Sequence, residues 1–153
     1  MRQNVIGVIG SHDCDKKTAK LAKELGKKLA NITDVLVCGG LGGVMEAACE
    51  GFKEAKGKIS IGIIPGYEKE DANLFVDIVI PTGIGLARNV LVVKSADIVI
   101  ALAGESGTLS EIAYCLQFGT PVISLKSWNI PGAMKVDTVK EAIDKVKELL
   151  RKE

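Results

Sequence analysis

The sequence has few of the residues that mark several common protein classes. Aromatic residues make up 4% of its 153 residues, there is one histidine, and the four cysteines form no CxxC pair. One histidine and dispersed cysteines do not build a metal site or a disulfide framework, so we expect no metal and small, reduced core cysteines. The formal net charge is +1. Without a broad basic field, neither nucleic acid nor an anionic membrane is an expected partner.

Long apolar runs are also missing from the chain. No run approaches the ~20 residues that span a bilayer, and the first residues lack the pattern of a signal peptide. These absences predict a cytoplasmic protein. A length of 153 residues suits one unit with a proper core. We therefore expect residues 1–153 to form a single Rossmann-like domain with an aliphatic interior.

Short β-branched runs alternate with segments of helical periodicity along the whole chain. Strands are predicted at residues 5–9, 35–38, 59–64, 78–80, 97–102 and 122–125. Helices are predicted at 16–30, 44–55, 88–93, 109–118 and 139–151, with loops at 67–75 and 127–134. Thr138 and Glu141 have the spacing of a capping box at the start of the last helix. The alternation predicts an α/β fold, a doubly wound, mainly parallel sheet with helices on both faces, whose ligand lies at the C-terminal strand ends.

Two glycine-rich turns each follow a predicted strand and lead into a predicted helix. They span residues 38–43 (CGGLGG) and 103–108 (AGESGT). Such turns offer free backbone N–H groups and the positive end of a helix dipole, which suit a phosphate. Either turn alone could be a tight connection that binds nothing, but the second occurrence favours a ligand. The residues predicted to bind it are Gly10, Ser11, Gly39, Gly40, Gly42, Gly43, Arg88, Asn89, Gly104, Ser106, Gly107 and Thr108.

Four polar side chains near these turns are candidates for contact with the ligand, and three of them have alternative interpretations. Glu111 either closes a capping box with Thr108 or places its carboxylate beside the bound anion for acid–base work. Arg88 either forks onto phosphate or pairs with Glu111, or it is a solvated surface arginine. Asn89 either contacts a ribose or base edge or caps a helix. His12 follows the first strand and lies on the predicted ligand rim.

Together these residues resemble the superfamily of LOG proteins (cytokinin-activating phosphoribohydrolases) and molybdenum cofactor carrier proteins. The enzyme branch carries a PGGxGTxxE pattern with an upstream arginine. Residues 103–111 match that pattern and Arg88 matches the arginine, with Ala103 in place of the proline and Glu105 in place of the second glycine. The turn at residues 39–45 and the strand ending at Gly10 extend the resemblance over nearly the whole chain.

The resemblance implies a cytoplasmic carrier-like protein that binds a nucleotide or a phosphorylated pterin and requires no cofactor of its own. The alternative that it implies is a phosphoribohydrolase cleaving the N-glycosidic bond of a nucleoside 5′-monophosphate, with Arg88 and Glu111 as the catalytic pair. The run at residues 43–47, and Asn89 where the enzymes usually have lysine, are nearer to the carrier-like branch. The resemblance also implies a homodimer or a larger homo-oligomer. No motif supports the older label of lysine decarboxylase, which needs a pyridoxal-binding lysine.

Overall fold

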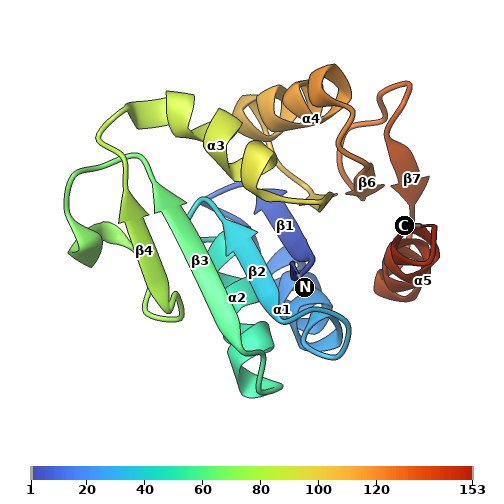
Figure 1. Ribbon diagram of the computed structural model, residues 1–153, viewed down its shortest axis with the longest axis horizontal. Helices are drawn as coiled ribbons and strands as arrows, with labels where there is room; N and C mark the ends of the chain where they lie inside the picture. The colour runs from blue at the N-terminus through green and yellow to red at the C-terminus, as the bar shows by residue number, and fades with distance from the viewer. Residues whose placement is uncertain (1, 153) are drawn as a thin grey trace.

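Seven parallel strands form one sheet in the computed structural model, which describes residues 2–152 (Figure 1). The strand order is β4-β3-β2-β1-β5-β6-β7, and every neighbouring pair is parallel. The strands are β1 (Val5–Gly10), β2 (Val35–Cys38), β3 (Ile59–Ile64), β4 (Ile78–Pro81), β5 (Ile98–Leu102), β6 (Val122–Leu125) and β7 (Met134–Val136). The predicted Rossmann-like α/β fold is confirmed.

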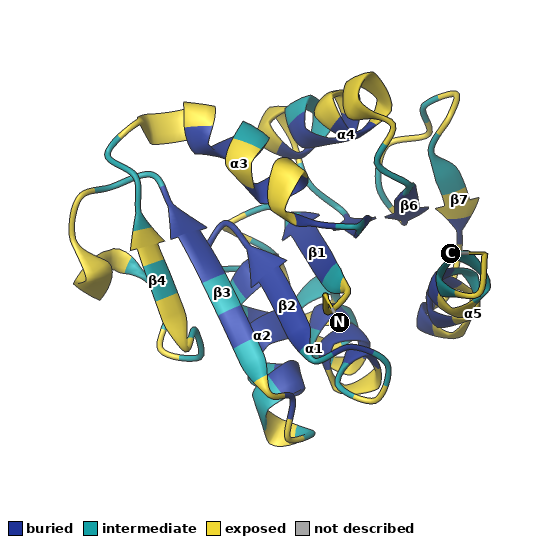
Figure 2. Ribbon diagram, in the orientation of Figure 1, coloured by how far each residue is buried: buried dark blue, intermediate teal, exposed yellow. Residues whose placement is uncertain are grey.

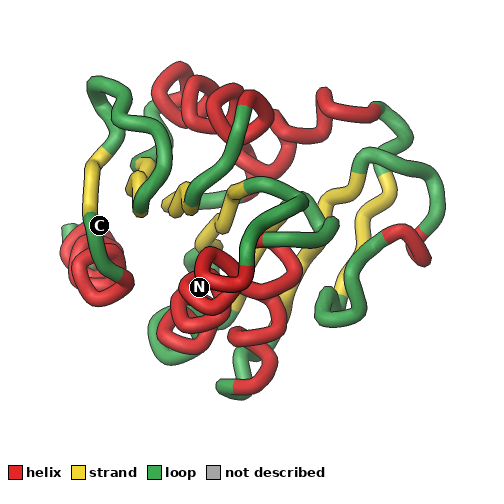
Figure 3. The backbone as a smooth tube through the Cα atoms, turned by 180° about the vertical axis from the view of Figure 1, so that it is seen from behind, coloured by secondary structure: helices red, strands yellow, loops and turns green. Residues whose placement is uncertain are grey.

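Helices cover both faces of this sheet (Figures 1 and 3). They are α1 (Lys16–Leu29), α2 (Val44–Glu54), α3 (Arg88–Ser95), α4 (Ser106–Phe118) and α5 (Val139–Leu150), with short 3-10 turns at Lys69–Asp71 and Gly85–Ala87. Helices α1, α2 and α5 pack on one face, and α3 and α4 pack on the other. The sheet is therefore doubly wound, as the alternation of runs in the sequence predicts.

The core is divided by the sheet into two layers because successive strand residues point to opposite faces. In β1, Ile6 and Val8 pack with α1, α2 and α5, whereas Ile9 packs with α3 and α4. In β5, Ile100 faces the first layer and Val99 the second. Both layers are aliphatic, which is why β2 and β5 are apolar on both sides and buried throughout, while the edge strand β4 is partly exposed (Figure 2).

Strand β1 marks the point where the strand order reverses. From β1 the chain adds β2, β3 and β4 on one side, and then crosses back to add β5, β6 and β7 on the other. The connections that leave β1 and β5 at their C-terminal ends therefore run to opposite faces. In open parallel sheets this divergence leaves a crevice that binds ligands.

Several predicted boundaries differ from the structure. Helix α4 begins at Ser106, three residues before the predicted start at 109, so Thr108 lies inside the helix and Glu105 is its N-cap. The predicted Thr108–Glu111 capping box is therefore wrong. Strand β7 was missed, because the predicted loop at 127–134 runs into only three strand residues at the sheet edge. The capping box of α5 is confirmed, with the Glu141 N–H donating to the Thr138 hydroxyl at 3.1 Å.

The four cysteines are free thiols, and three of them are buried in the core. Between residues 2 and 152, no helix has the length and apolar character needed to cross a bilayer.

The turn that leads into α2 depends on a glycine at its last position. Gly43 has φ +62°, and a Cβ at this position would lie 2.3 Å from the carbonyl oxygen of Ser11. That same carbonyl accepts a hydrogen bond from the Val44 N–H at 3.0 Å. The end of β1 and the start of α2 therefore approach so closely that position 43 has no room for a side chain larger than the hydrogen atom of glycine.

We expect Gly43→Ala to destabilise the protein by about 3 kcal/mol, since it adds a steric clash to an unfavourable backbone angle. Gly119→Ala is the matched control: Gly119 also has a positive φ of +72°, but no heavy atom lies within 4 Å of its Cβ position. The control should lose only about 1 kcal/mol. Urea unfolding measures the free energy of unfolding of both variants. An equal decrease in the two would show that the clash with the Ser11 carbonyl does not contribute.

Candidate functional site

A cavity of about 300 Å³ opens over the C-terminal ends of β1, β2 and β5. This is the crevice at the reversal of strand order, where a ligand site is predicted. Its lining consists of Ile9, Gly10, Ser11, His12, Gly39, Leu41, Met45, Leu86, Arg88, Asn89, Glu105, Ser106, Gly107, Thr108 and Glu111. Both glycine-rich turns contribute residues, so segments about 65 positions apart in the sequence meet in one site.

Helix α4 points its N-terminus into the cavity. The Leu109 N–H donates to the Glu105 carbonyl at 2.9 Å, which closes the first helical turn. The N–H groups of Ser106, Gly107 and Thr108 precede that bond and therefore lack partners within the helix. Gly104 makes this geometry possible: it has φ +100°, and a Cβ there would lie 2.2 Å from the Thr108 hydroxyl oxygen. The result is a cluster of free donors at the positive end of the helix dipole.

Glu111 lies one turn further along α4 and also lines the cavity. It is 7% exposed, and no hydrogen bond or ion pair to its carboxyl group is found among residues 2–152, where burial and the charge of Arg88 alone shift its pKa. Burial raises the pKa of Glu111 to about 8, and the nearby positive charge of Arg88 opposes this rise only in part. A buried carboxyl that is directed into a cavity without a partner is suited to meet a polar atom of a ligand.

Arg88 is 6% exposed, lines the cavity and packs against Gly39, where a Cβ would lie 2.8 Å from its guanidinium nitrogen. Its Nε–H donates to the carbonyl of Ile63 at 2.9 Å, one Nη donates to the Gly39 carbonyl at 3.4 Å, and the other donates to the side-chain oxygen of Asn89. Burial lowers the pKa of Arg88, and the Glu111 charge partly opposes this effect. The interpretation of Arg88 as a solvated surface residue is wrong, because three of its donors hold protein atoms in the interior.

Arg88 and Glu111 do not form the direct ion pair that the sequence allows, since no ion pair within 4.0 Å joins them in the described chain. They influence each other through their charges instead. Asn89 does not cap a helix: its amide nitrogen donates to the hydroxyl of Ser110 at 3.3 Å, which ties α3 to α4. His12 lies on the cavity rim with an exposed side chain, 3.5 Å from the Asp13 carboxylate.

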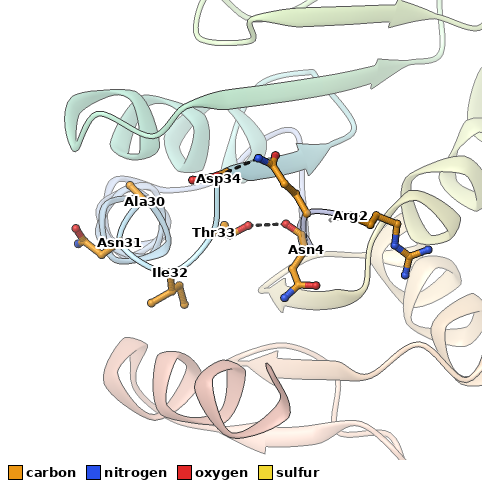
Figure 4. Close-up of a pocket in the computed structure, with 8 residues that line it drawn as sticks. Arg2, Asn4, Ala30, Asn31, Ile32, Thr33 and Asp34 are labelled. Atoms are coloured by element: carbon orange, nitrogen blue, oxygen red, sulfur yellow. Dashed lines mark hydrogen bonds between the residues drawn. The ribbon is translucent and has the colours of Figure 1, made fainter. Parts of the chain in front are cut away.

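A second, more open hollow of about 540 Å³ lies at the opposite edge of the sheet (Figure 4). It is lined by residues that precede β1 and β2, and its polar groups bond one another. The Thr33 hydroxyl donates to the carbonyl of Asn4 at 2.8 Å, and Gln3 donates to the Asp34 carboxylate at 3.1 Å. This hollow brings together no helix N-terminus and no unpartnered buried group, so the smaller cavity is the better candidate.

Comparison with known proteins places the chain in a family. A model of the SLOG cluster4 family matches residues 3–152. The chain belongs to this family. An uncharacterised protein of Archaeoglobus fulgidus is 43% identical over 145 residues, which cover 94% of this chain and 95% of that protein.

Two solved structures are similar in fold over the full length. The molybdenum cofactor binding protein from Rippkaea orientalis has a TM-score of 0.91 at 34% identity, covering 98% of this chain and 99% of that one. The molybdenum cofactor carrier protein from Chlamydomonas reinhardtii has a TM-score of 0.89 at 33% identity, with the same coverage. The resemblance to this superfamily, inferred from the glycine turns, is thereby confirmed.

The structure separates the predicted ligand residues into two groups. Eight of the twelve line the cavity, namely Gly10, Ser11, Gly39, Arg88, Asn89, Ser106, Gly107 and Thr108. The other four, Gly40, Gly42, Gly43 and Gly104, lie outside its lining and shape the turns. For example, the Gly40 carbonyl accepts from the Asn73 N–H at 2.9 Å, so the β3–β4 connection supports the first glycine turn.

Sequence reasoning missed the apolar part of the site. Leu41, Met45 and Leu86 line the cavity, together with Ile9 at the end of β1. From the sequence alone, these residues cannot be told apart from core residues. In the structure Leu86 is exposed, unlike a core residue. Glu105 also reaches the cavity; its replacement of a glycine in the family pattern is the signal that identifies it.

The buried Glu111 should make stability depend on pH. In the unfolded chain its carboxyl loses a proton near pH 4.5, whereas in the folded protein it keeps that proton up to about pH 8. The folded state therefore binds more protons between these values, and its stability falls as pH rises through this window. We expect Glu111→Gln to be more stable than the natural chain by on the order of 3 kcal/mol at pH 8.

Urea unfolding at pH 5 and pH 8 measures this effect. At pH 5 the two proteins should differ by less than about 1 kcal/mol, because Glu111 is protonated in the folded state and pH 5 lies only slightly above the pKa of its carboxyl in the unfolded chain. Glu24→Gln, at an exposed position on α1, is the control and should leave the pH profile unchanged. A profile of Glu111→Gln that parallels the natural chain would contradict the buried, protonated state.

Proposed function

We propose that the protein is a carrier-type binding protein for a phosphorylated pterin, such as the molybdenum cofactor, rather than an enzyme that transforms it. The observation that carries this proposal is the convergence of the free N–H groups of α4 with the unpartnered Glu111 in one cavity. The similarity over 98% of the chain to proteins that bind or carry the molybdenum cofactor supports the choice of ligand. A nucleotide has the same combination of phosphate and flat ring, and it is the other ligand in this class.

The phosphate belongs at the start of α4 in this proposal. The N–H groups of Ser106, Gly107 and Thr108 supply donors, and the helix dipole contributes roughly half a positive charge there. The Thr108 side chain is 3% exposed and faces the same cavity. Glu105 works against this arrangement, since this acidic residue lines the cavity at the N-cap of α4, next to the phosphate donors. Binding would then be weaker than the bare backbone allows, which suits a protein that must also release its ligand.

The ring system belongs on the apolar side of the cavity. Leu41 from the first glycine turn, Met45 from α2 and Leu86 give the cavity an apolar lining that suits a flat heterocycle. The buried Glu111 lies on α4 one turn beyond the phosphate donors and lines the same cavity as this surface. As a protonated carboxyl at neutral pH it donates one hydrogen bond and accepts others, without bringing a second negative charge close to the phosphate.

One observation favours the phosphoribohydrolase as a second candidate. Glu111 is a buried acid whose pKa of about 8 keeps it protonated near neutral pH. A carboxylic acid in that state can protonate a leaving group, as in the cleavage of glycosidic bonds. Arg88 is less available for such a reaction, because its guanidinium already bonds Ile63, Gly39 and Asn89.

Calorimetry with pterin phosphates and nucleoside 5′-monophosphates, followed by an assay for free base, separates the two candidates. We expect binding without release of base. Glu105→Gln should tighten binding about fivefold, since it removes roughly 1 kcal/mol of repulsion from a phosphate dianion. Glu24→Gln is the control for a distant loss of charge. Release of base that disappears in Glu111→Gln would overturn the carrier proposal, and absence of any binding would exclude both candidates.

We also propose that the protein forms a homodimer through α3 and α4. Apolar side chains on these neighbouring helices are exposed, among them Leu91, Tyr114 and Phe118. The rings of Tyr114 and Phe118 stack with their centroids 5.8 Å apart, and the Lys94 ammonium lies 4.8 Å from the Phe118 centroid. A second copy of the chain would cover this surface in the isologous manner of most homodimers.

Light scattering coupled to size-exclusion chromatography tests this arrangement. The natural chain should have the mass of a dimer, and Tyr114→Asp should shift it to a monomer because a charge would be buried in the interface. Leu74→Asp is the matched control, since Leu74 is exposed elsewhere on the surface and should leave the dimer intact. A monomeric natural chain would contradict the proposal.

A further inference from the structure

The segment after β6 contacts the outer side of the turn that begins α4. The Ser127 hydroxyl donates to the carbonyl of Ala103, and the indole N–H of Trp128 donates to the carbonyl of Glu105 at 3.2 Å. The backbone of Trp128 is itself fixed, because the buried Ser124 donates from its hydroxyl to the Trp128 carbonyl at 2.6 Å. Neither Ser127 nor Trp128 lines the ligand cavity.

Both sides of this contact have an unusual backbone. Ala103 has φ +51° and Lys126 has φ +49°, a region in which residues other than glycine are disfavoured by roughly 1–2 kcal/mol. Such conformations persist only where the surrounding structure holds them. The hydroxyl of Ser127, next to Lys126, donates to the carbonyl of Ala103. This bond links the two segments that have a disfavoured backbone conformation and stabilises both.

These bonds have a consequence for the orientation of the turn. The Glu105 carbonyl accepts from both the Leu109 N–H, at 2.9 Å, and the Trp128 indole, at 3.2 Å. The Ala103 carbonyl is directed toward Ser127. With both carbonyl oxygens turned outward to partners, the partial negative charges of the turn face away from the cavity. The N–H groups of residues 106–108 are then left as the groups that a ligand meets.

We propose that Ser127 and Trp128 are positioning residues for the anion site. They hold the carbonyls of the α4 turn on the outer side and so keep the donors of that turn directed at the phosphate. This inference rests on the proposed function, because it assumes that an anion binds at the start of α4. In this proposal, Ser127 and Trp128 affect the affinity for the anion although neither residue lines the cavity.

Trp128 also provides a signal for this arrangement. It is the one tryptophan of the chain, and its indole N–H bonds the N-cap residue of α4. Any adjustment of the turn on binding an anion changes the environment of this indole. The intrinsic fluorescence of the protein should therefore shift in a saturable way when inorganic phosphate or a pterin phosphate is added.

The experiment compares four variants by calorimetry with a pterin phosphate. Ser127→Ala and Trp128→Phe each remove one bond to the turn, and each should weaken binding about three- to tenfold, as expected for one hydrogen bond. Ser127→Thr keeps the hydroxyl and should restore affinity to within about twofold of the natural chain. Asn129→Ala changes a neighbour that borders the same outer surface, and it is the control for changes in this segment.

The outcomes distinguish the two proposals. If the natural chain does not bind, the proposed function fails. If the natural chain binds and both Ser127→Ala and Trp128→Phe bind equally well, the positioning role is overturned while the proposed function stands. Thermal unfolding of each variant is measured in parallel, and a loss of affinity that Ser127→Thr fails to restore would likewise contradict the role of the hydroxyl.

Discussion

The central position of β1 is the constraint on which the rest of the molecule depends. It pairs in parallel with β2 on one side and with β5 on the other, so the chain must leave it in two directions. The two glycine-rich turns follow the two strands that flank β1, which brings them together although they are far apart in the sequence. At its end, Gly10 is so close to β5 and α2 that a Cβ would lie 2.6 Å from the Leu102 carbonyl oxygen. The site exists because three strand ends can approach one another this closely.

Electrostatics in the site follow from burial more than from direct pairing. Arg88 is enclosed and satisfies its donors with the carbonyls of Ile63 and Gly39 and with Asn89, so it fixes the ends of β2 and β3 relative to α3. Glu111 is enclosed as well but has no such partners, and burial keeps its carboxyl protonated up to about pH 8. The Arg88 charge therefore stabilises the fold, whereas the Glu111 carboxyl remains available to a ligand. Because this carboxyl is buried without a partner, the free energy of unfolding decreases at alkaline pH.

Much of this arrangement is predictable from the sequence, and the exceptions have physical causes. Periodicity and β-branched runs locate the six longer strands and the helices, because burial of a whole face leaves a regular pattern. Strand β7 has three residues at an edge, too short for any pattern. The start of α4 was predicted too late because Ser106 and Gly107 have low helix propensity, yet the helix extends to Glu105, whose carbonyl accepts the first helical bond. The positions of Leu41 and Met45 required three dimensions, since apolar residues of a site resemble those of a core.

The balance between holding and cleaving a ligand comes down to what surrounds Glu111. Cleavage of a glycosidic bond needs an acid together with a second charged group that stabilises the developing positive charge on the sugar. In this chain the nearest cation, Arg88, would oppose such a charge, and its donors are already engaged with backbone and Asn89. A neutral carboxyl beside an apolar surface, next to helix donors for a phosphate, is better matched to recognising a ligand than to splitting it. On the proposed function, Glu105 in the lining of the cavity would weaken binding of a phosphate dianion, and moderate affinity would favour release of a carried ligand.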